Sequence, residues 1–194
     1  MNLIMKKQII TLAGAPGSGK SSTADKLAKE LNYQRFSSGD FMRKIALDMS
    51  ISLNELSTLA ETDTSIDEKI DAEVQKAREM NNAVIDSRLA YHWIPESFKV
   101  YLSLPANIAK ERILSNLKTN KLRQESEGIS NVEEIYKKIT HRMESEKKRY
   151  KELYNIDHTD KNNFDLVIDT NENNLNKVVE TILKEYENWQ NKKD

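Results

Sequence analysis

The sequence predicts a three-layer α/β fold in which a five-stranded parallel sheet lies between layers of helices. Two observations carry this prediction. Short apolar runs alternate with longer amphipathic segments, which is typical of right-handed βαβ units, and four of the five glycines fall within the first forty residues. The 194 residues, 38% of them hydrophobic, suffice for one large core but not for two ordinary domains.

The first half of the chain opens with a strand, a glycine-rich loop and a helix. Gln8–Ala13 (QIITLA) has the length and β-branched content of a buried strand that ends at Gly14. Lys20–Leu31 carries apolar residues at three- and four-residue spacing, which predicts a helix packed on the sheet. The next expected elements are a strand at Tyr33–Ser37 and helices at Phe41–Met49, Leu53–Ala60 and Ile66–Met80, with Ser52 and Ser65 as N-caps.

The second half continues the same alternation. The remaining strands are expected at Ala83–Asp86, Phe98–Leu104 and Phe164–Asp169, with long helices between them. Pro105 suits the first residue of the helix after the fourth strand, and Trp189 should close a C-terminal helix onto the sheet. No repeat or linker interrupts the chain, so residues 1–194 are expected to form a single domain.

Composition excludes several classes of protein. Thirty Lys and Arg against 31 Asp and Glu give a net charge of -1, which leaves no basic surplus for nucleic acid. No apolar run approaches the length of a membrane span, and the N-terminus lacks a secretory pattern, so a cytoplasmic protein is expected. Zero cysteines exclude disulfides and Cys-ligated metals. The three scattered histidines suit surface or capping positions.

The glycine-rich loop has the pattern of a phosphate-binding loop. Gly14–Ser21 (GAPGSGKS) matches G-x-x-x-x-G-K-[ST] in full and lies between a predicted strand and a predicted helix. Backbone N–H groups and the helix N-terminus attract phosphate oxygens, Lys20 neutralises them, and Ser21 can ligate Mg²⁺, with Asp86 at a strand end as a second metal-binding group. The predicted ATP site comprises Gly14, Ala15, Pro16, Gly17, Ser18, Gly19, Lys20, Ser21 and Ser22.

Three further motifs accompany this loop. They are Ser37–Arg43 (SSGDFMR), Val84–Leu89 (VIDSRL), and Arg142, Glu146 and Arg149 at the spacing R-x-x-x-E-x-x-R, followed by the segment YNIDHTD. With these motifs the chain resembles the P-loop nucleoside monophosphate kinases, and within them the short, archaeal-type cytidylate kinase family. The likeness runs from about residue 8 to residue 170.

The resemblance implies a three-layer P-loop NTPase fold that phosphorylates CMP or dCMP with ATP and Mg²⁺. It implies a core of residues 8–38, 83–118 and 160–190, a helical acceptor-binding region at 39–82 and a helical lid at about 119–152. A monomer is expected, with a dimer as the alternative. The implied catalytic residues are Lys20, Arg88, Arg142 and Arg149. The implied acceptor-binding residues are Ser38, Gly39, Asp40, Arg43 and Arg88. Asp71 and Gln75 are added as candidates for contacts with the acceptor base.

The distribution of arginine supports this interpretation independently. Only eight of the 30 basic residues are Arg, and four of these lie at the phosphate positions of the motifs: Arg43, Arg88, Arg142 and Arg149. Bidentate Arg suits phosphate better than Lys does. Because a phosphate acceptor is already ionised near neutral pH, positioning and charge neutralisation can carry the transfer without a general base.

Two positions depart from the family pattern, and other functions stay open. Ser87 and Asn155 stand where the family has glycine; a side chain at Ser87 narrows the acceptor site, whereas Asn tolerates left-handed backbone angles. The alternatives are a P-loop kinase for another nucleotide or for an acceptor such as shikimate, and a GTP-binding switch suggested by NKKD at residues 191–194. The latter motif lies at the chain end rather than after a central strand, and no D-x-x-G accompanies it.

Overall fold

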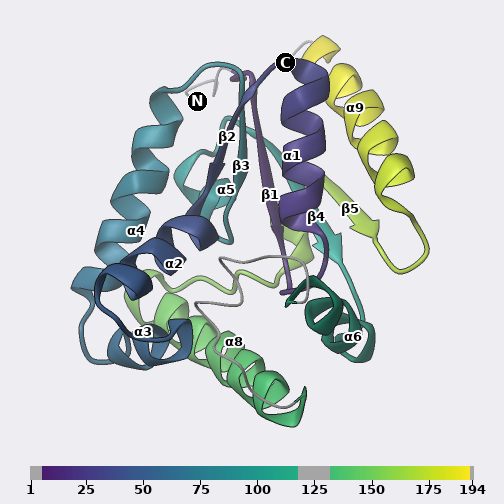
Figure 1. The fold of residues 1–194 in the computed structure, drawn as a ribbon. Coiled ribbons are helices and arrows are strands. Elements are labelled where there is room, and N and C mark those ends of the chain that lie inside the picture. Colours follow the sequence, from purple (N-terminus) through teal and green to yellow (C-terminus); the bar gives the residue numbers. More distant parts are fainter. Residues whose placement is uncertain (1–5, 118–131, 193–194) are drawn as a thin grey trace.

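The sheet has the predicted number of strands, all of them parallel. The structure, a computed structural model, describes residues 6–117 and 132–192 (Figure 1). Its five strands lie in the order β2-β3-β1-β4-β5. They are β1 (Ile9–Gly14), β2 (Gln34–Ser37), β3 (Ala83–Asp86), β4 (Phe98–Ser103) and β5 (Leu166–Asp169). The central strand β1 pairs with β3 on one side and with β4 on the other, which confirms the predicted α/β fold.

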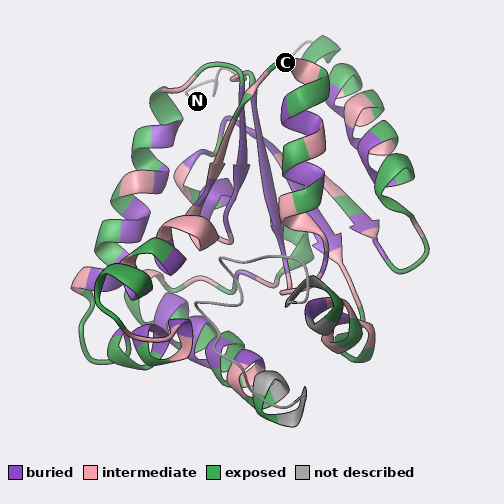
Figure 2. Ribbon diagram, viewed as in Figure 1, coloured by how far each residue is buried: buried purple, intermediate pink, exposed green. Residues whose placement is uncertain are grey.

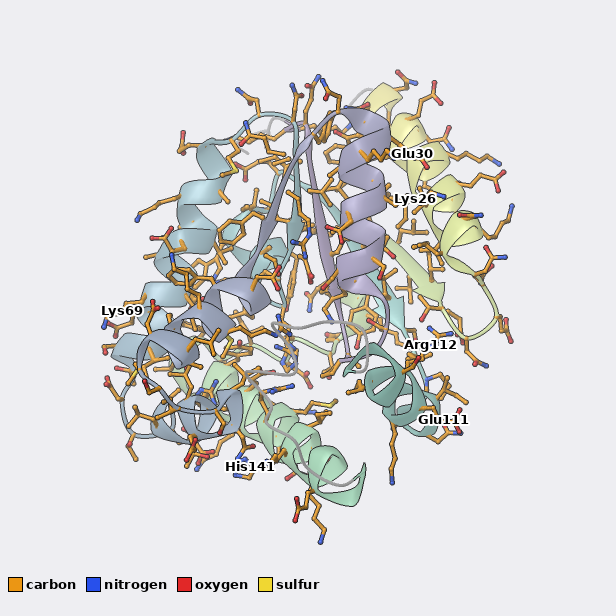
Figure 3. All side chains as sticks on the ribbon, in the orientation of Figure 1. Lys26, Glu30, Lys69, Glu111, Arg112 and His141 are labelled. Atoms are coloured by element: carbon orange, nitrogen blue, oxygen red, sulfur yellow. The ribbon has the colours of Figure 1, made fainter. Side chains whose placement is uncertain are left out.

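Helices α1 (Lys20–Leu31) and α9 (Leu175–Asn191) cover one face of the sheet (Figure 1). Their apolar residues, Leu27 and Ile182 among them, bury a shared core against β1, β3 and β4. Figure 2 shows α1 buried toward the sheet and exposed on its outer side. Lys26 and Glu30 form an i,i+4 ion pair of 3.7 Å on this helix (Figure 3). Trp189 of α9 packs against this core, as predicted.

The opposite face of the sheet is covered by α4 (Ser65–Lys76), the short 3₁₀ helix η1 (Ala77–Glu79) and α5 (Ala90–Trp93). Val74, Ala90 and Ile94 are fully buried there against Ile9 and Ile85. Every residue of β1 and β3 is buried, because helices cover both faces of the sheet.

Four helices surround the C-terminal ends of the strands. They are α2 (Ser38–Asp48), α3 (Leu53–Leu59), α6 (Ala106–Leu117) and α8 (Val132–Tyr154) (Figure 1). A third apolar cluster, which includes Met42, Leu56 and Ile70, joins α2, α3 and α4 into one body. This edge of a parallel sheet is where ligands bind in open α/β folds.

Most expected helix ends are observed within one residue, but α2 begins three residues earlier than expected, and α4 ends four residues earlier, where η1 follows it. Ser52 caps α3 in a complete capping box with Glu55. The expected Ser65 cap is wrong: Thr64 occupies the N-cap position, and the Ser65 N–H donates to the Asp63 carboxylate at 3.0 Å instead. Pro105 immediately precedes α6, and its carbonyl accepts the N–H of Ala109.

Part of the predicted lid lies outside the described residues, namely residues 119–131. The remainder belongs to α8, which packs against α3 in the region expected to bind the acceptor (Figure 1). A second 3₁₀ helix, η2 (Lys161–Asn163), follows α8 and leads into β5. Within residues 6–117 and 132–192, no helix has the length and apolar character required to cross a bilayer.

Candidate active site

The loop between β1 and α1 has the backbone of a phosphate-binding cradle. Gly17 and Gly19 have φ angles of 80° and 87°, which L-residues with side chains rarely adopt. At Gly14 the constraint is space as well, because a Cβ would lie 2.3 Å from the Leu102 carbonyl oxygen on β4. The loop therefore follows a path that presents N–H groups at the start of α1, where the helix dipole favours anions.

The two side chains of this loop that carry chemistry occupy its mouth. The Lys20 ammonium reaches back over the loop and donates to the carbonyl oxygens of Gly14 and Ala15, at 2.7 and 2.9 Å. The Ser21 hydroxyl donates to Oδ2 of Asp86 at 2.8 Å. Asp86 ends β3, which adjoins β1 in the sheet, so the predicted hydroxyl and carboxylate of the metal site are neighbours. A hard oxygen pair of this kind suits Mg²⁺.

The motif Ser37–Arg43, which is expected to bind the acceptor, forms the N-terminal part of α2. Ser37 caps this helix by accepting the N–H of Asp40, and Gly39 leaves room for the Arg43 guanidinium, which a Cβ there would approach to 3.3 Å. Asp40 accepts from Arg43 at 2.9 Å and thereby fixes its orientation. The Ser38 hydroxyl lies 3.5 Å from the Asp86 carbonyl oxygen.

A third group of charged residues comes from the segment after β3 and from α8. Arg88 donates to Oε1 of Glu146 at 2.8 Å, and the Glu146 side chain is 1% exposed. Arg142 lies one turn earlier on α8 and is also buried. These contacts bring the strand-end motif and the predicted lid motif into one place, although 54 residues separate Arg88 from Arg142.

One pocket unites the three groups. Its lining consists of Pro16, Gly17, Gly19, Lys20, Ser21, Ser22 and Asp25; Ser37, Ser38, Gly39, Met42 and Arg43; Leu53; Asp86, Ser87 and Arg88; Ile113; and Ile139, Arg142 and Glu146. The sequence therefore identified most of the polar lining. It missed Glu146, Asp25 and Ser37 as lining groups, together with the apolar contributions of Met42, Leu53, Ile113 and Ile139.

Other predicted site residues do not line this pocket. Gly14, Ala15 and Ser18 belong to the loop beneath it, and Asp40 supports Arg43 from behind. Gln75 is exposed on α4. The remaining two, Asp71 and Arg149, lie in contacts between α4 and α8.

Arg149 is buried in an ion pair. Its Nε donates to Oδ2 of Asp67 at 2.6 Å, and its Nη1 donates to the Ser57 carbonyl oxygen at 3.2 Å. Both charged side chains are 3% exposed. Burial raises the pKa of Asp67 above its ordinary value even though Arg149 donates to the carboxylate. In this structure Arg149 therefore connects α8 to α3 and α4 rather than facing the loop.

Asp71 makes a parallel contact one helical turn further along α4. The Tyr154 hydroxyl donates to its Oδ2. Burial raises the pKa of Asp71 to about 6, and the neighbouring Asp67 charge adds to the increase. Its carboxyl is thus committed to α8 and does not line the pocket proposed for the acceptor.

His158 differs from the sequence expectation of surface or capping positions. It is buried, and its ring meets Tyr150 edge-on at 5.3 Å between centroids. Burial and the charge of Arg88 lower the pKa of His158 to about 4, so the ring is neutral at physiological pH. The surrounding sequence is polar and gave no apolar pattern that would have predicted burial. His92 and His141 are exposed, as expected.

A second hollow adjoins the back of the phosphate-binding loop and was not predicted. Its volume is about 260 Å³, and it is lined by Gly17, Ser18, Gly19, Ser22, Thr23, Arg112, Ser115, Thr170, Asn173, Leu175 and Val178. Arg112 of α6 (Figure 3) donates to the Thr170 carbonyl oxygen at 2.6 Å. Arginine is rare in this chain, and this rarity was the signal that could have marked Arg112 as a candidate site residue.

Comparison with known proteins decides the family. The chain matches the cytidylate kinase-like family over residues 9–172. It belongs to the cytidylate kinase-like family. Its relatives include the cytidylate kinase of Methanocella arvoryzae, 37% identical over 91% of this chain and 95% of the relative. Another is the cytidylate kinase of Methanosphaera stadtmanae, 31% identical over 93% of this chain and 98% of the relative.

Solved structures confirm the fold of this family member. A shikimate kinase from Bacteroides thetaiotaomicron superposes with a TM-score of 0.60 over 92% of this chain and 98% of that one, at 15% identity. A shikimate kinase from Acinetobacter baumannii gives a TM-score of 0.58 at 16% identity, covering 95% of each chain. At such identities the likeness shows a shared kinase fold and nothing about the acceptor.

The structure accounts differently for the two departures from the cytidylate kinase pattern. Asn155 has a φ of 56°, so this position requires a left-handed backbone, and Asn supplies it. Among the described non-glycine residues, those with a positive φ are Asn32, Ser50, Asn82 and Asn155. Ser87 is not one of them. Serine at position 87 therefore adds a buried side chain to the pocket without backbone strain.

Proposed function

We propose that this chain transfers the γ-phosphoryl group of ATP to a nucleoside monophosphate, CMP or dCMP in the first place. The observation that carries the proposal is the composition of the pocket. The phosphate-binding loop with Lys20 forms one wall, and Arg43, Arg88 and Arg142 reach the same space from three separate elements. Two phosphorylated ligands facing each other need cations supplied in this manner.

The roles of the donor-side residues follow from their positions. The loop N–H groups and Lys20 bind the β- and γ-phosphates and neutralise the charge that develops on the transferred group. Ser21 and Asp86 would hold Mg²⁺, which supplies charge neutralisation at the phosphate oxygens. We propose that the donor base occupies the hollow beside Arg112 and Thr170, because that hollow opens directly from the loop.

The roles of the acceptor-side residues follow in the same way. Arg43, oriented by Asp40, and Arg88 bind the acceptor phosphate, and Ser38 donates a further hydrogen bond. Arg142 brings another positive charge from α8. The acceptor oxygen is already anionic near neutral pH, so these groups need only align it with the γ-phosphorus. We assign no residue to the base, because Asp71 and Gln75 do not line the pocket.

A panel of acceptors tests this function. ADP release with ATP and Mg²⁺ is measured against CMP, dCMP, UMP, AMP, GMP and shikimate at equal concentration, beside a reaction without acceptor. We expect the largest rate with CMP or dCMP. A preference for shikimate or for another nucleotide would replace the acceptor assignment, and release that ignores every acceptor would indicate an NTP hydrolase or switch instead.

A further inference from the structure

Arg35 is a charged residue beside the pocket to which no motif assigns a role. It lies on β2, where its register partner on β3 is Val84, and Ser37 is the partner of Asp86. Because side chains alternate along a strand, Arg35 and Ser37 point to the same face of the sheet. That face is the one covered by α1, since Val84 packs in the core beneath this helix.

Three carboxylates surround the Arg35 guanidinium. Its Nε lies 2.9 Å from Asp25 of α1, its Nη1 lies 2.9 Å from Oδ2 of Asp40, and its Nη2 lies 3.8 Å from Oδ2 of Asp86. The Arg35 side chain is 24% exposed and that of Asp86 is 7% exposed. Asp25 is the most solvated of the three partners, so water screens its pair with Arg35 more than it screens the other two.

Two of these carboxylates belong to opposite halves of the site. Asp40 uses its other oxygen to hold Arg43, which is proposed to bind the acceptor phosphate. Asp86 accepts the Ser21 hydroxyl at the metal position with the same oxygen that faces Arg35. Three ion pairs and one hydrogen bond therefore connect Arg43 through Asp40, Arg35 and Asp86 to Ser21.

The planar fork of arginine suits this position, because it can address separate carboxylates in fixed directions, which a lysine ammonium on a flexible stem cannot do. Without the guanidinium, Asp40 would keep only Arg43 and Asp86 only the Ser21 hydroxyl as the partners described above, and no cation would link the two carboxylates. Transfer depends on sub-ångström alignment of the reacting groups, so this spacing matters for the reaction.

We propose that Arg35 is a positioning residue that couples the acceptor-phosphate site to the Mg²⁺-binding carboxylate. Arg35 itself does not line the pocket. The proposal rests on the function proposed above. A purely structural role, in which Arg35 only ties β2 to α1 through Asp25, would make different predictions for ligand binding.

The test compares Arg35→Ala and Arg35→Lys with the unaltered chain by calorimetric titration. Arg78→Ala is the matched control, since Arg78 also pairs with a carboxylate, Glu96, and neither residue of that pair lines the pocket. We measure the affinity for ADP with and without Mg²⁺, and the affinity for CMP. Thermal unfolding of each variant shows whether the fold is retained.

For Arg35→Ala we expect CMP binding to weaken on the order of tenfold and the gain in ADP affinity from Mg²⁺ to shrink, with metal-free ADP affinity unchanged. Arg35→Lys should restore either the CMP affinity or the gain in ADP affinity from Mg²⁺ more than the other, because a single ammonium cannot pair with both Asp40 and Asp86. Should Arg35→Ala not fold, Arg35→Lys carries the same comparison.

Variants that change the melting temperature but neither CMP affinity nor the Mg²⁺ gain would overturn the coupling and leave Arg35 a structural residue. Failure of the proposed function is distinguishable, because then the unaltered chain itself would bind no CMP. In that case the Mg²⁺ gain in ADP affinity still decides whether Arg35 supports Asp86.

Discussion

Replacing Asp71 with Asn should stabilise the protein at neutral pH, although it removes a buried charge that accepts a hydrogen bond. Burial raises the pKa of Asp71 from 3.8 to about 6. A carboxyl whose pKa is higher in the folded state binds protons more tightly there, so its ionisation costs stability as the pH rises from about 4 to about 6. This difference in pKa corresponds to roughly 3 kcal/mol, an upper figure for the free energy of unfolding lost by pH 7.

Asn keeps the steric shape and can still accept the Tyr154 hydroxyl through its amide oxygen. Urea unfolding of both proteins from pH 4 to pH 8, followed by circular dichroism, measures the effect. We expect near-equal stability at pH 4 and a growing advantage for Asp71→Asn above it. Glu68→Gln, which neutralises an exposed acid on the same helix, is the control and should show no such trend.

The reasoning is refuted if Asp71→Asn is less stable than the unaltered chain at pH 7.5. That result would mean that the ionised carboxylate gains more from its partners than burial costs it. A difference that stays constant across the pH range would refute it as well, because it would place the effect in packing rather than in ionisation.

The remaining predictions concern the site and the contacts of α8. Lys20→Ala should abolish phosphoryl transfer in the coupled assay while the circular dichroism spectrum is unchanged; unchanged turnover would remove Lys20 from the mechanism. Arg88→Ala should lower kcat/KM for the acceptor about tenfold to a hundredfold with ATP affinity retained, and a loss of ATP binding would place Arg88 on the donor instead. Arg149→Met should lower the free energy of unfolding by about 3 to 5 kcal/mol in urea, because it leaves Asp67 buried without its cation; an unchanged midpoint would show that the pair is dispensable.

Local patterns predicted the elements that build the core. The stripe of α1 and the buried run of β3 have the predicted bounds, because packing against the sheet and intrinsic preference favour the same structure there. The phosphate-binding loop was equally predictable, since the backbone of the loop itself requires positive φ angles at Gly17 and Gly19. Structure that is determined by the residues of one segment can therefore be predicted from the sequence of that segment.

The sequence was less informative where a side chain's partner lies far along the chain. The lowered pKa of His158 depends in part on the charge of Arg88, which lies 70 residues earlier in the chain. Arg35 lies in no motif, yet the parallel register of β2 and β3 brings it beside Asp86, 51 residues away. Such contacts depend on strand order, which hydrophobic periodicity does not specify.

The different placements of Arg142 and Arg149 show the same limit within one helix. The two are seven residues apart, so they share a face of α8, and motif spacing treats them alike. At 1.5 Å per residue, however, they lie about 10 Å apart along the helix axis. Arg142 therefore reaches the pocket, whereas Arg149 reaches Asp67.

This distance changes the mechanical interpretation of the predicted lid. The contacts of Arg149 with Asp67 and Ser57, and of Tyr154 with Asp71, attach the C-terminal half of α8 to α3 and α4. A motion that carried the whole helix over the nucleotides would have to break a buried ion pair, which is costly because it leaves an uncompensated charge. In the described residues, α8 and the acceptor-binding region therefore form one packed body, and Arg142 is presented to the pocket by a helix that the acceptor-binding region already holds in place.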